Sequence, residues 1–156
     1  IENDYEHVLS SGFDEFLRDE TQRVFSTSLN SVEGVVQVLE FLIENNINFC
    51  VASNGGNKKV RNSLCTTKIK KYFPENKIFS SENVDHGKPA PDLFLHAASK
   101  MNVNPEECWV IEDSELGVQA AKSAEIFCVG FGGVKADVEA CSMGEVQSLI
   151  LERYIN

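Results

Sequence analysis

Apolar residues follow two different spacings along this chain of 156 residues. Short, nearly continuous apolar runs predict buried strands over 47–52, 77–80, 108–111 and 126–131. Elsewhere apolar residues recur every three or four positions, which predicts helices after Gly34, after Gly56, and over 91–101, 116–124 and 143–154. Strands that alternate with helices indicate an α/β fold, in which helices cover both faces of a parallel sheet.

Polar residues mark the places where several of these elements begin. Ser31 is a candidate N-cap for the helix near Gly34, and Asn104-Pro105 combines a capping residue with proline at the first helical position. A further segment with helical spacing covers 14–29. The chain is therefore predicted to begin with a helical segment and to continue as alternating strands and helices.

Two acidic residues, Glu112 and Asp113, directly follow the strand over 108–111. Open α/β sheets bind ligands at the carboxyl ends of their strands, which is where these side chains are expected. Two carboxylates about 4 Å apart repel each other by roughly 4 kcal/mol at an effective dielectric constant near 20, so the pair favours a cation. Oxygen ligands suit Mg²⁺. The alternative for this run alone is a solvated acidic loop.

The strand over 47–52 leads into a Ser53-Asn54-Gly55 turn, and a helix is predicted after it. A hydroxyl, free backbone N–H groups and the positive end of a helix dipole make such a turn a candidate anion site, above all for phosphate. The alternative is an ordinary turn in which Ser53 or Asn54 caps the helix.

Lys88 lies between glycine and proline residues, in the segment His86-Gly87-Lys88-Pro89-Ala90-Pro91. The two prolines restrict the backbone and deny Lys88 a helical conformation. A lysine on such a rigid turn is positioned to meet a fixed anion, whereas surface lysines are usually solvated. His86 is a further candidate for substrate contact.

In this order and spacing, the three segments resemble the haloacid dehalogenase (HAD) superfamily of phosphotransferases. The resemblance extends over 32–156 and rests on three motifs. They are Val51-Ala52-Ser53-Asn54-Gly55 for phosphate binding, Gly87-Lys88-Pro89-Ala90-Pro91 for the catalytic lysine, and Ile111-Glu112-Asp113-Ser114 for the metal. The resemblance implies a Rossmann-like parallel sheet and a phosphatase that uses Mg²⁺.

The resemblance also implies roles for individual residues. Asp113 would be the principal Mg²⁺ ligand, with Glu112 as the second ligand or its close neighbour. Ser53 and Lys88 would be catalytic and, together with Asn54 and Gly55, would bind the phosphate. Other segments, among them Tyr72-Phe73-Pro74, are similar to bacterial sugar-phosphate phosphatases, including enzymes that act on 6-phosphogluconate. The implied substrate is a small phosphorylated metabolite, hydrolysed through an aspartyl-phosphate.

One motif of the superfamily has no counterpart in this sequence. The nucleophile of these enzymes is the first aspartate of an Asp-x-Asp-x-Thr motif after an N-terminal strand. Asp4 and Asp14 match neither that pattern nor that context. We therefore expect 1–30 to be the C-terminal part of a helical cap and 31–156 to be the core without its first strand. The nucleophile would then lie outside this chain, and the chain by itself would be inactive.

The missing strand is central in the sheet of the resembled fold. Its absence predicts two partial sheets with unpaired inner edges, which invite pairing with another chain. Self-association, or binding of a complementing N-terminal segment, is therefore expected across these edges.

Composition narrows the class of partner. The formal net charge of −10 argues against nucleic acid or an anionic membrane as a partner, and no apolar run approaches the length of a membrane span. The five cysteines show no metal-binding spacing, and Cys50, Cys108 and Cys128 lie in apolar runs as candidate buried thiols. This pattern indicates a reducing, cytoplasmic compartment.

Three other functions share parts of this pattern. A β-phosphoglucomutase would use the same core but would return the phosphoryl group to a sugar. A haloacid dehalogenase needs no metal, so the Glu112-Asp113 pair argues against it. A non-catalytic binding domain would follow if the chain naturally lacked its nucleophile. A smaller departure is Glu125, which stands where the superfamily usually has glycine and predicts a different helix ending.

Overall fold

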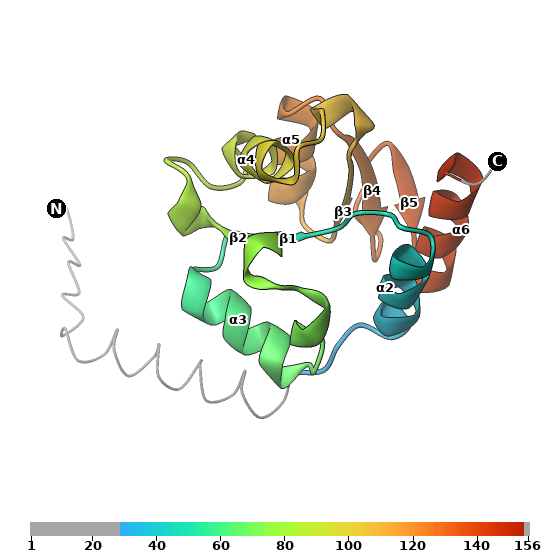
Figure 1. The fold of residues 1–156 in the computed structure, drawn as a ribbon. Helices are drawn as coiled ribbons and strands as arrows, with labels where there is room; N and C mark the ends of the chain where they lie inside the picture. The colour runs from blue at the N-terminus through green and yellow to red at the C-terminus, as the bar shows by residue number, and fades with distance from the viewer. Residues whose placement is uncertain (1–28, 155–156) are drawn as a thin grey trace, which may run out of the picture.

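The computed structural model describes residues 29–154, which form parallel strands flanked by helices (Figure 1). Strand β1 (Val51–Ser53) pairs with β2 (Ile78–Ser80), so that Ala52 lies opposite Phe79. A second sheet contains β3 (Trp109–Glu112), β4 (Phe127–Phe131) and β5 (Val138–Ala140), in that order. All three strand pairings are parallel, which confirms the predicted α/β class.

Five α-helices and four short 3₁₀ helices connect these strands within the described residues. The α-helices are α2 (Val35–Glu44), α3 (Asn57–Thr66), α4 (Asp92–Met101), α5 (Glu115–Ser123) and α6 (Met143–Tyr154). The 3₁₀ helices are η1 (Lys70–Tyr72), η2 (Glu75–Lys77), η3 (Ser81–Asn83) and η4 (Pro105–Glu107). The segment 14–29 and the proposed cap over 1–30 lie almost entirely outside the described residues.

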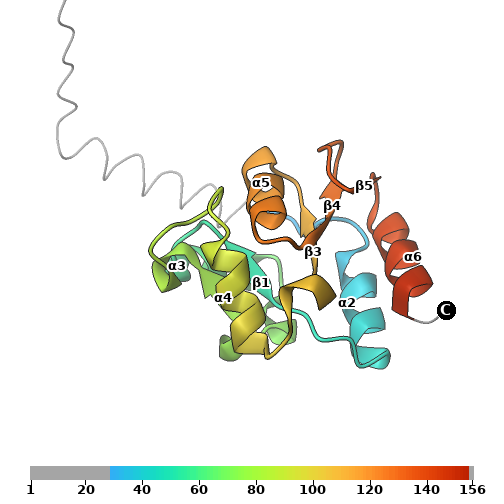
Figure 2. The same ribbon diagram turned by 90° about the horizontal axis from the view of Figure 1, so that it is seen from above.

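The helices form a layer on each face of the strands (Figures 1 and 2). Successive residues of a strand point to opposite faces, and the core clusters follow this alternation. Ala52 and Val110 pack with Phe94 of α4 and with residues of α5. Val51 packs with residues of α2 and α3, and Trp109 packs with residues of α2 and α6. The molecule therefore has three layers, with α4 and α5 on one side and α2, α3 and α6 on the other.

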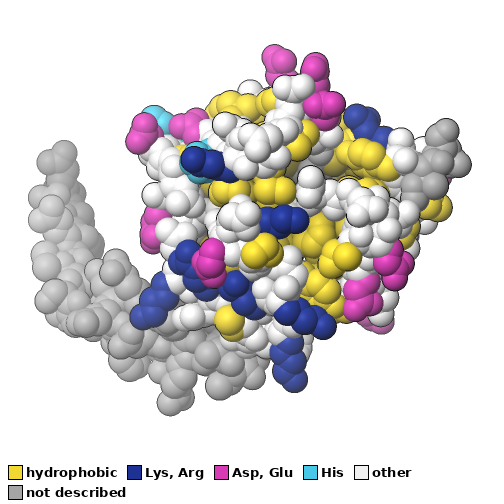
Figure 3. Space-filling model, viewed as in Figure 1, with side chains coloured by type: hydrophobic (Ala, Val, Ile, Leu, Met, Phe, Trp, Pro, Cys, Tyr) yellow, Lys and Arg dark blue, Asp and Glu magenta, His cyan; other side chains and the backbone are white. Residues whose placement is uncertain are grey.

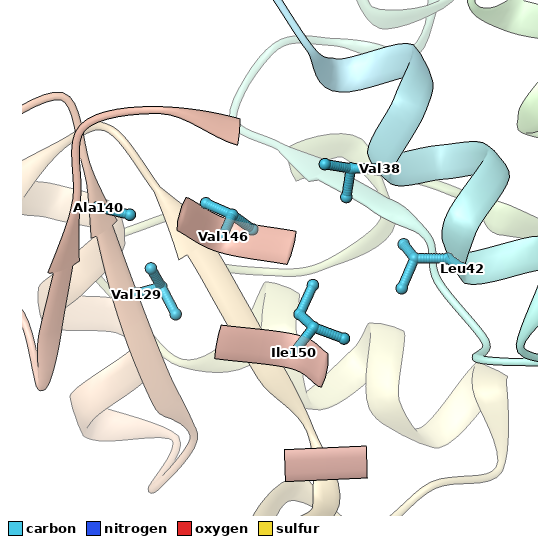
Figure 4. Packing of buried hydrophobic residues seen from close by; sticks show 6 residues of the cluster. All are labelled: Val38, Leu42, Val129, Ala140, Val146 and Ile150. Atoms are coloured by element: carbon cyan, nitrogen blue, oxygen red, sulfur yellow. The ribbon is translucent and has the colours of Figure 1, made fainter. Parts of the chain in front are cut away.

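The largest core cluster lies between β4 and the helices α2 and α6 (Figure 4). Val129 of β4 is fully buried at its centre, because β4 has a strand on either side and a helix on each face. The other buried members of this cluster are Val38, Leu42, Ala140, Val146 and Ile150. Aliphatic side chains from α2, β4, β5 and α6 thus hold the C-terminal helix on the sheet.

The two sheets are not joined to each other by strand pairing. Among the described residues, β1 pairs only with β2, and β3 pairs only with β4. Each of these two strands therefore has one edge without a partner strand. This arrangement confirms the predicted pair of partial sheets with unpaired inner edges. Ile111 of β3 is 41% exposed, and hydrophobic side chains gather in the middle of the face seen in Figure 3.

Two local predictions were wrong, and one strand was not predicted. Gly34, not Ser31, is the N-cap of α2, and its backbone is left-handed with φ of 81°. The segment 138–140 was not predicted as a strand, because three residues are too few for a pattern and only pairing with β4 makes it one. Glu125 adopts φ of 57°, so the helix ends in the left-handed geometry without a glycine.

The observed strand bounds lie close to the predicted ones. The first strand is shorter than predicted, because only Val51–Ser53 finds a partner in β2. Of the thiols predicted to be buried, only Cys128 is fully buried, and Cys50 and Cys108 are partly buried. No helix within residues 29–154 has the length and apolar character needed to cross a membrane.

Candidate active site

The Ser53 turn lies at the carboxyl end of β1, directly before α3. The Ser53 Oγ accepts a hydrogen bond from the N–H of Gly55 at 3.2 Å. Helix α3 then starts after Gly56, which has an extended backbone and makes no side-chain cap. The alternative in which Ser53 or Asn54 caps this helix is therefore wrong. In this conformation the Ser53 hydroxyl proton remains available to an anion, while the Gly55 N–H is engaged by Ser53 itself.

Lys88 reaches across the space between the two sheets. Its Nζ donates to the carbonyl oxygen of Ala52 at 3.1 Å and also to Oε1 of Glu112. The Lys88 and Glu112 side chains are each only 8% exposed. The Phe94 ring of α4 lies 4.6 Å below the ammonium and adds a favourable cation–π contact. One ammonium group thus brings the carboxyl ends of β1 and β3 to the same place.

The lysine loop is held by Asn54, a contact that the sequence pattern did not predict. The side chain of Asn54 makes two hydrogen bonds to the Lys88 backbone, one to its N–H and one to its carbonyl oxygen. The resemblance to the HAD superfamily implies that the Asn54 backbone N–H binds phosphate, and that role stays a prediction. The two residues are 34 positions apart, so no local signal indicates the contact.

Glu112 is the last residue of β3, and its carboxylate is fixed from two sides. While Oε1 meets Lys88, Oε2 accepts a hydrogen bond from Ser114 Oγ at 2.7 Å. The same Ser114 Oγ accepts the N–H of Gly117 at 3.1 Å and caps helix α5. Gly117 has to be small, because a Cβ there would lie 2.0 Å from the Glu112 carboxyl group. The helix cap, the glycine and the lysine together set the orientation of one carboxylate.

Asp113 follows Glu112 at the edge of the sheet and is exposed. The predicted pair of carboxylates therefore consists of one buried group that is paired with Lys88 and one group open to solvent. Among the described residues no group of three or more His, Cys, Asp or Glu residues is arranged to hold a metal. Mg²⁺ usually binds through one or two carboxylates together with water and substrate phosphate oxygens, so Glu112 and Asp113 fit it in number and chemistry.

The buried Lys88–Glu112 pair also has a structural consequence. Removing one partner of a buried ion pair costs about 3–5 kcal/mol, because the other charge is left buried and uncompensated. The stability of the carboxyl edge is therefore linked to the residues proposed for its chemistry.

Two histidines, His86 and His96, lie within the described residues, and both are apart from this cluster. His86 is exposed, and its Nδ1 lies 3.1 Å from Asp92 Oδ2 at the start of α4. His96 packs edge-on against Phe79, at 5.8 Å between ring centroids. Neither contacts Ser53, Lys88 or Glu112 through a described hydrogen bond. A role for His86 in substrate contact stays a prediction.

Comparison with known proteins identifies the family. The model of the haloacid dehalogenase-like hydrolases matches residues 3–131. The chain belongs to this family. Its fold resembles that of a conserved haloacid dehalogenase-like protein of unknown function from Agrobacterium tumefaciens str. C58. That match has a TM-score of 0.81 and 24% identity, and it covers 92% of this chain and 70% of the other.

Two relatives have assigned functions. The chain is 38% identical over 112 residues to the 6-phosphogluconate phosphatase of Escherichia coli (strain K12), covering 70% of this chain and 49% of the relative. It is 35% identical over 114 residues to the phosphorylated carbohydrates phosphatase of Thermotoga maritima, covering 73% of this chain and 52% of the relative. The chain thus spans about half the length of these relatives.

Proposed function

We propose that this chain forms most of the core of a Mg²⁺-dependent phosphatase for a small phosphorylated metabolite, most simply a sugar phosphate. The observation that carries the proposal is the contact of Lys88 Nζ with both Ala52, one residue before the end of β1, and Glu112, the last residue of β3. It joins the three segments that the sequence indicated separately. The names of the two relatives, both phosphatases of phosphorylated carbohydrates, support the class of substrate.

In this proposal the phosphoryl group lies at the carboxyl edge, between Ser53 and Lys88. The Ser53 hydroxyl and the Asn54–Gly55 backbone N–H groups donate to the phosphoryl oxygens, and the Lys88 ammonium balances their charge. Gly55 N–H would have to exchange its bond to Ser53 Oγ for one to phosphate. Fixed donors of this kind stabilise the charge that develops during phosphoryl transfer.

Asp113 and Glu112 would hold Mg²⁺. When bound, this ion neutralises charge on the phosphate and orients it. Lys88 holds the first carboxylate oxygen of Glu112 in place, and Ser114 fixes the second. The exposed Asp113 is free to turn toward a ligand at the edge of the sheet.

The attacking group is assigned to an aspartate on a further strand between β1 and β3, where the inner edges of both sheets are unpaired. Its carboxylate attacks phosphorus, the substrate alcohol leaves with a proton, and an aspartyl-phosphate forms. Water then attacks the phosphorus, releases inorganic phosphate and restores the carboxylate. Residues 1–30 would belong to the helical cap over this site. The five free thiols are consistent with a cytoplasmic location.

Two measurements on one preparation test this function. The intact mass of the polypeptide is measured beside hydrolysis of p-nitrophenyl phosphate and a panel of sugar phosphates, with and without Mg²⁺. Mg²⁺-dependent turnover by a polypeptide larger than 17.3 kDa supports the proposal. Turnover by the 17.3 kDa chain itself contradicts the assigned nucleophile. Return of the phosphoryl group to sugar identifies a mutase, and phosphate binding without turnover identifies a binding domain.

A further inference from the structure

Both ends of the Asn54 side-chain amide bond the backbone of the lysine loop. The Lys88 N–H donates to Asn54 Oδ1 at 2.8 Å, and Asn54 Nδ2 donates to the Lys88 carbonyl oxygen at 2.9 Å. One amide side chain thus pairs with both polar groups of one residue, as a neighbouring strand would. An aspartate could accept the N–H but would place a carboxylate oxygen against the carbonyl oxygen, because it has no donor.

Two further contacts tie neighbouring segments to the same asparagine. The backbone carbonyl oxygen of Asn54 accepts a hydrogen bond from Ser81 Oγ of η3 at 2.9 Å. At Gly87, a Cβ would lie 2.7 Å from Asn54 Oδ1 and 3.4 Å from the Cβ of Ser81. Gly87 is not in the left-handed region, so the space beside Asn54, and not its backbone conformation, disfavours a larger residue.

Asn54 holds the Lys88 backbone at the point from which the lysine side chain extends across the space between the two sheets. The Lys88 backbone is held at Asn54, on the β1 side, and its Nζ ends on Ala52 and Glu112. The Lys88–Pro89 peptide bond is cis, and Pro89 has no N–H to donate. Within the described residues, the hydrogen bonds from Asn54 are the side-chain contacts that fix the Lys88 backbone.

We propose that Asn54 is a positioning residue that acts through Lys88. Its side-chain amide fixes the backbone of the lysine loop so that the ammonium meets the carboxyl ends of β1 and β3 together. The effect of Asn54 on catalysis rests on the proposed function. The hydrogen bonds between Asn54 and the Lys88 backbone do not depend on that function, and they are tested separately. A direct bond from the Asn54 side chain to phosphate, and a general stabilising role, are the two alternatives.

Hydrogen exchange tests the contact without any need for turnover. In Asn54→Ala, the Lys88 amide proton is expected to exchange at least about tenfold faster than in the unaltered protein, because its acceptor is gone. The matched control is Asn45→Ala, which removes an exposed asparagine whose Nδ2 bonds the Phe41 carbonyl oxygen at 2.9 Å. Unchanged exchange at Lys88 in Asn54→Ala, or equal acceleration in both variants, would overturn the proposal.

Gly87→Ala supplies a second, independent readout. In the unaltered background, its Cβ is expected to displace the Asn54 amide and to speed exchange at Lys88. In the Asn54→Ala background, the contacting Oδ1 is absent and the nearest remaining atom recorded is the Ser81 Cβ, at an ordinary 3.4 Å, so adding Gly87→Ala should change exchange little. Equal effects of Gly87→Ala in both backgrounds would contradict the assigned contact.

Kinetics of the active protein then test whether Asn54 acts through the lysine. Asn54→Ala is expected to lower kcat by about 10- to 100-fold, the range expected when a catalytic group is misplaced by about 1 Å. Adding Asn54→Ala to Lys88→Ala should cost little more, because no ammonium is left to position. Additive losses would mean that Asn54 touches the substrate itself. If a longer polypeptide that includes the proposed further strand hydrolyses no phosphate monoester, the proposed function fails, while the exchange measurements still decide the contact.

Discussion

At the scale of single residues, the site depends on how closely side chains approach one another. Gly117 and Gly144 show this, since both lie in the first turn of a helix. A Cβ at Gly117 would meet the Glu112 carboxyl group at 2.0 Å, whereas the nearest atom to a Cβ at Gly144 is Ser142 Oγ at 3.8 Å. Glycine is therefore required by the Glu112 carboxylate in α5, whereas packing does not require it in α6.

Replacing these two glycines with alanine should change stability in opposite directions. Gly117→Ala is expected to lower the free energy of unfolding by about 1–3 kcal/mol, because the new methyl group overpacks a buried carboxylate. Gly144→Ala should raise it by up to about 1 kcal/mol, as glycine is a poor helix former. Urea unfolding of the two variants beside the unaltered protein measures both. A stabilising Gly117→Ala would show that Glu112 does not occupy the described position.

Thiol reactivity gives a prediction that depends on pH. Burial raises the pKa of Cys50 and Cys128 from 9.0 to about 11, and at Cys128 the nearby Glu112 carboxylate adds to the shift. At pH 8 only about one in a thousand of these groups is a thiolate. Ellman's reagent should therefore modify the exposed Cys65 and Cys141 quickly, and Cys50 and Cys128 only after unfolding.

The same shifts affect stability in alkaline solution. Above pH 9 the unfolded thiols lose protons that the folded ones keep, so the free energy of unfolding should fall as the pH rises from 9 toward 11.

In the labelling experiment with Ellman's reagent, peptide mapping identifies which cysteines react. Labelling of native Cys128 at pH 8 as fast as that of Cys141 would contradict its burial.

At the scale of elements, most helices and strands were predicted from spacing, because an amphipathic pattern states which face must be buried. The endings were harder. Helix α5 runs to Ser123, with Ala124 as its C-cap, and the next residue, Glu125, is left-handed with φ of 57°. Ile126 is 3% exposed, so tertiary packing requires the chain to turn here. The cost of the left-handed conformation is offset by the burial of the following strand.

Glycine at position 125 should relieve that cost. A left-handed conformation costs about 1–2 kcal/mol for most residues and little for glycine. Glu125→Gly is therefore expected to raise the free energy of unfolding by about 1 kcal/mol after the entropic penalty of glycine. Asn102→Gly, at φ of 55°, is the control and should gain less, because asparagine adopts this region more readily. Thermal unfolding of both variants gives the comparison, and a loss of stability in Glu125→Gly would contradict the argument.

At the scale of the whole molecule, two partial sheets lie between the same two layers of helices. Their inner edges carry unpaired backbone groups among the described residues, and Ile111 leaves 41% of its surface exposed beside them. Unpaired edges of this kind pair readily with another strand. Lys88 spans the gap only at the carboxyl end.

If these edges drive self-association, one exposed residue on them should matter more than an equally exposed residue elsewhere. Ile111→Lys is expected to shift the sedimentation of a concentrated sample toward the monomer. The control is Leu151→Lys on α6, because Leu151 is also 41% exposed and the substitution adds the same charge. This variant should leave the sedimentation unchanged. Equal effects of the two variants would assign association to net charge, which is −10 in the unaltered chain. A monomer at all concentrations would remove the expected self-association.

Residue patterns alone were enough to predict the class of fold, the order of its elements and the residues Ser53, Lys88, Glu112 and Asp113 as candidates. It could do so because hydrophobic spacing and turn chemistry are local properties of the chain. The folded structure was needed to show that Glu112 is buried while Asp113 is exposed, that Asn54 holds the Lys88 loop, and that Gly117 must lack a side chain. The contacts of Asn54 and Glu112 with Lys88 join segments far apart in the chain, and the Gly117 constraint follows from the orientation that Lys88 and Ser114 give to Glu112. Patterns of residue type carry no information about such positions in space.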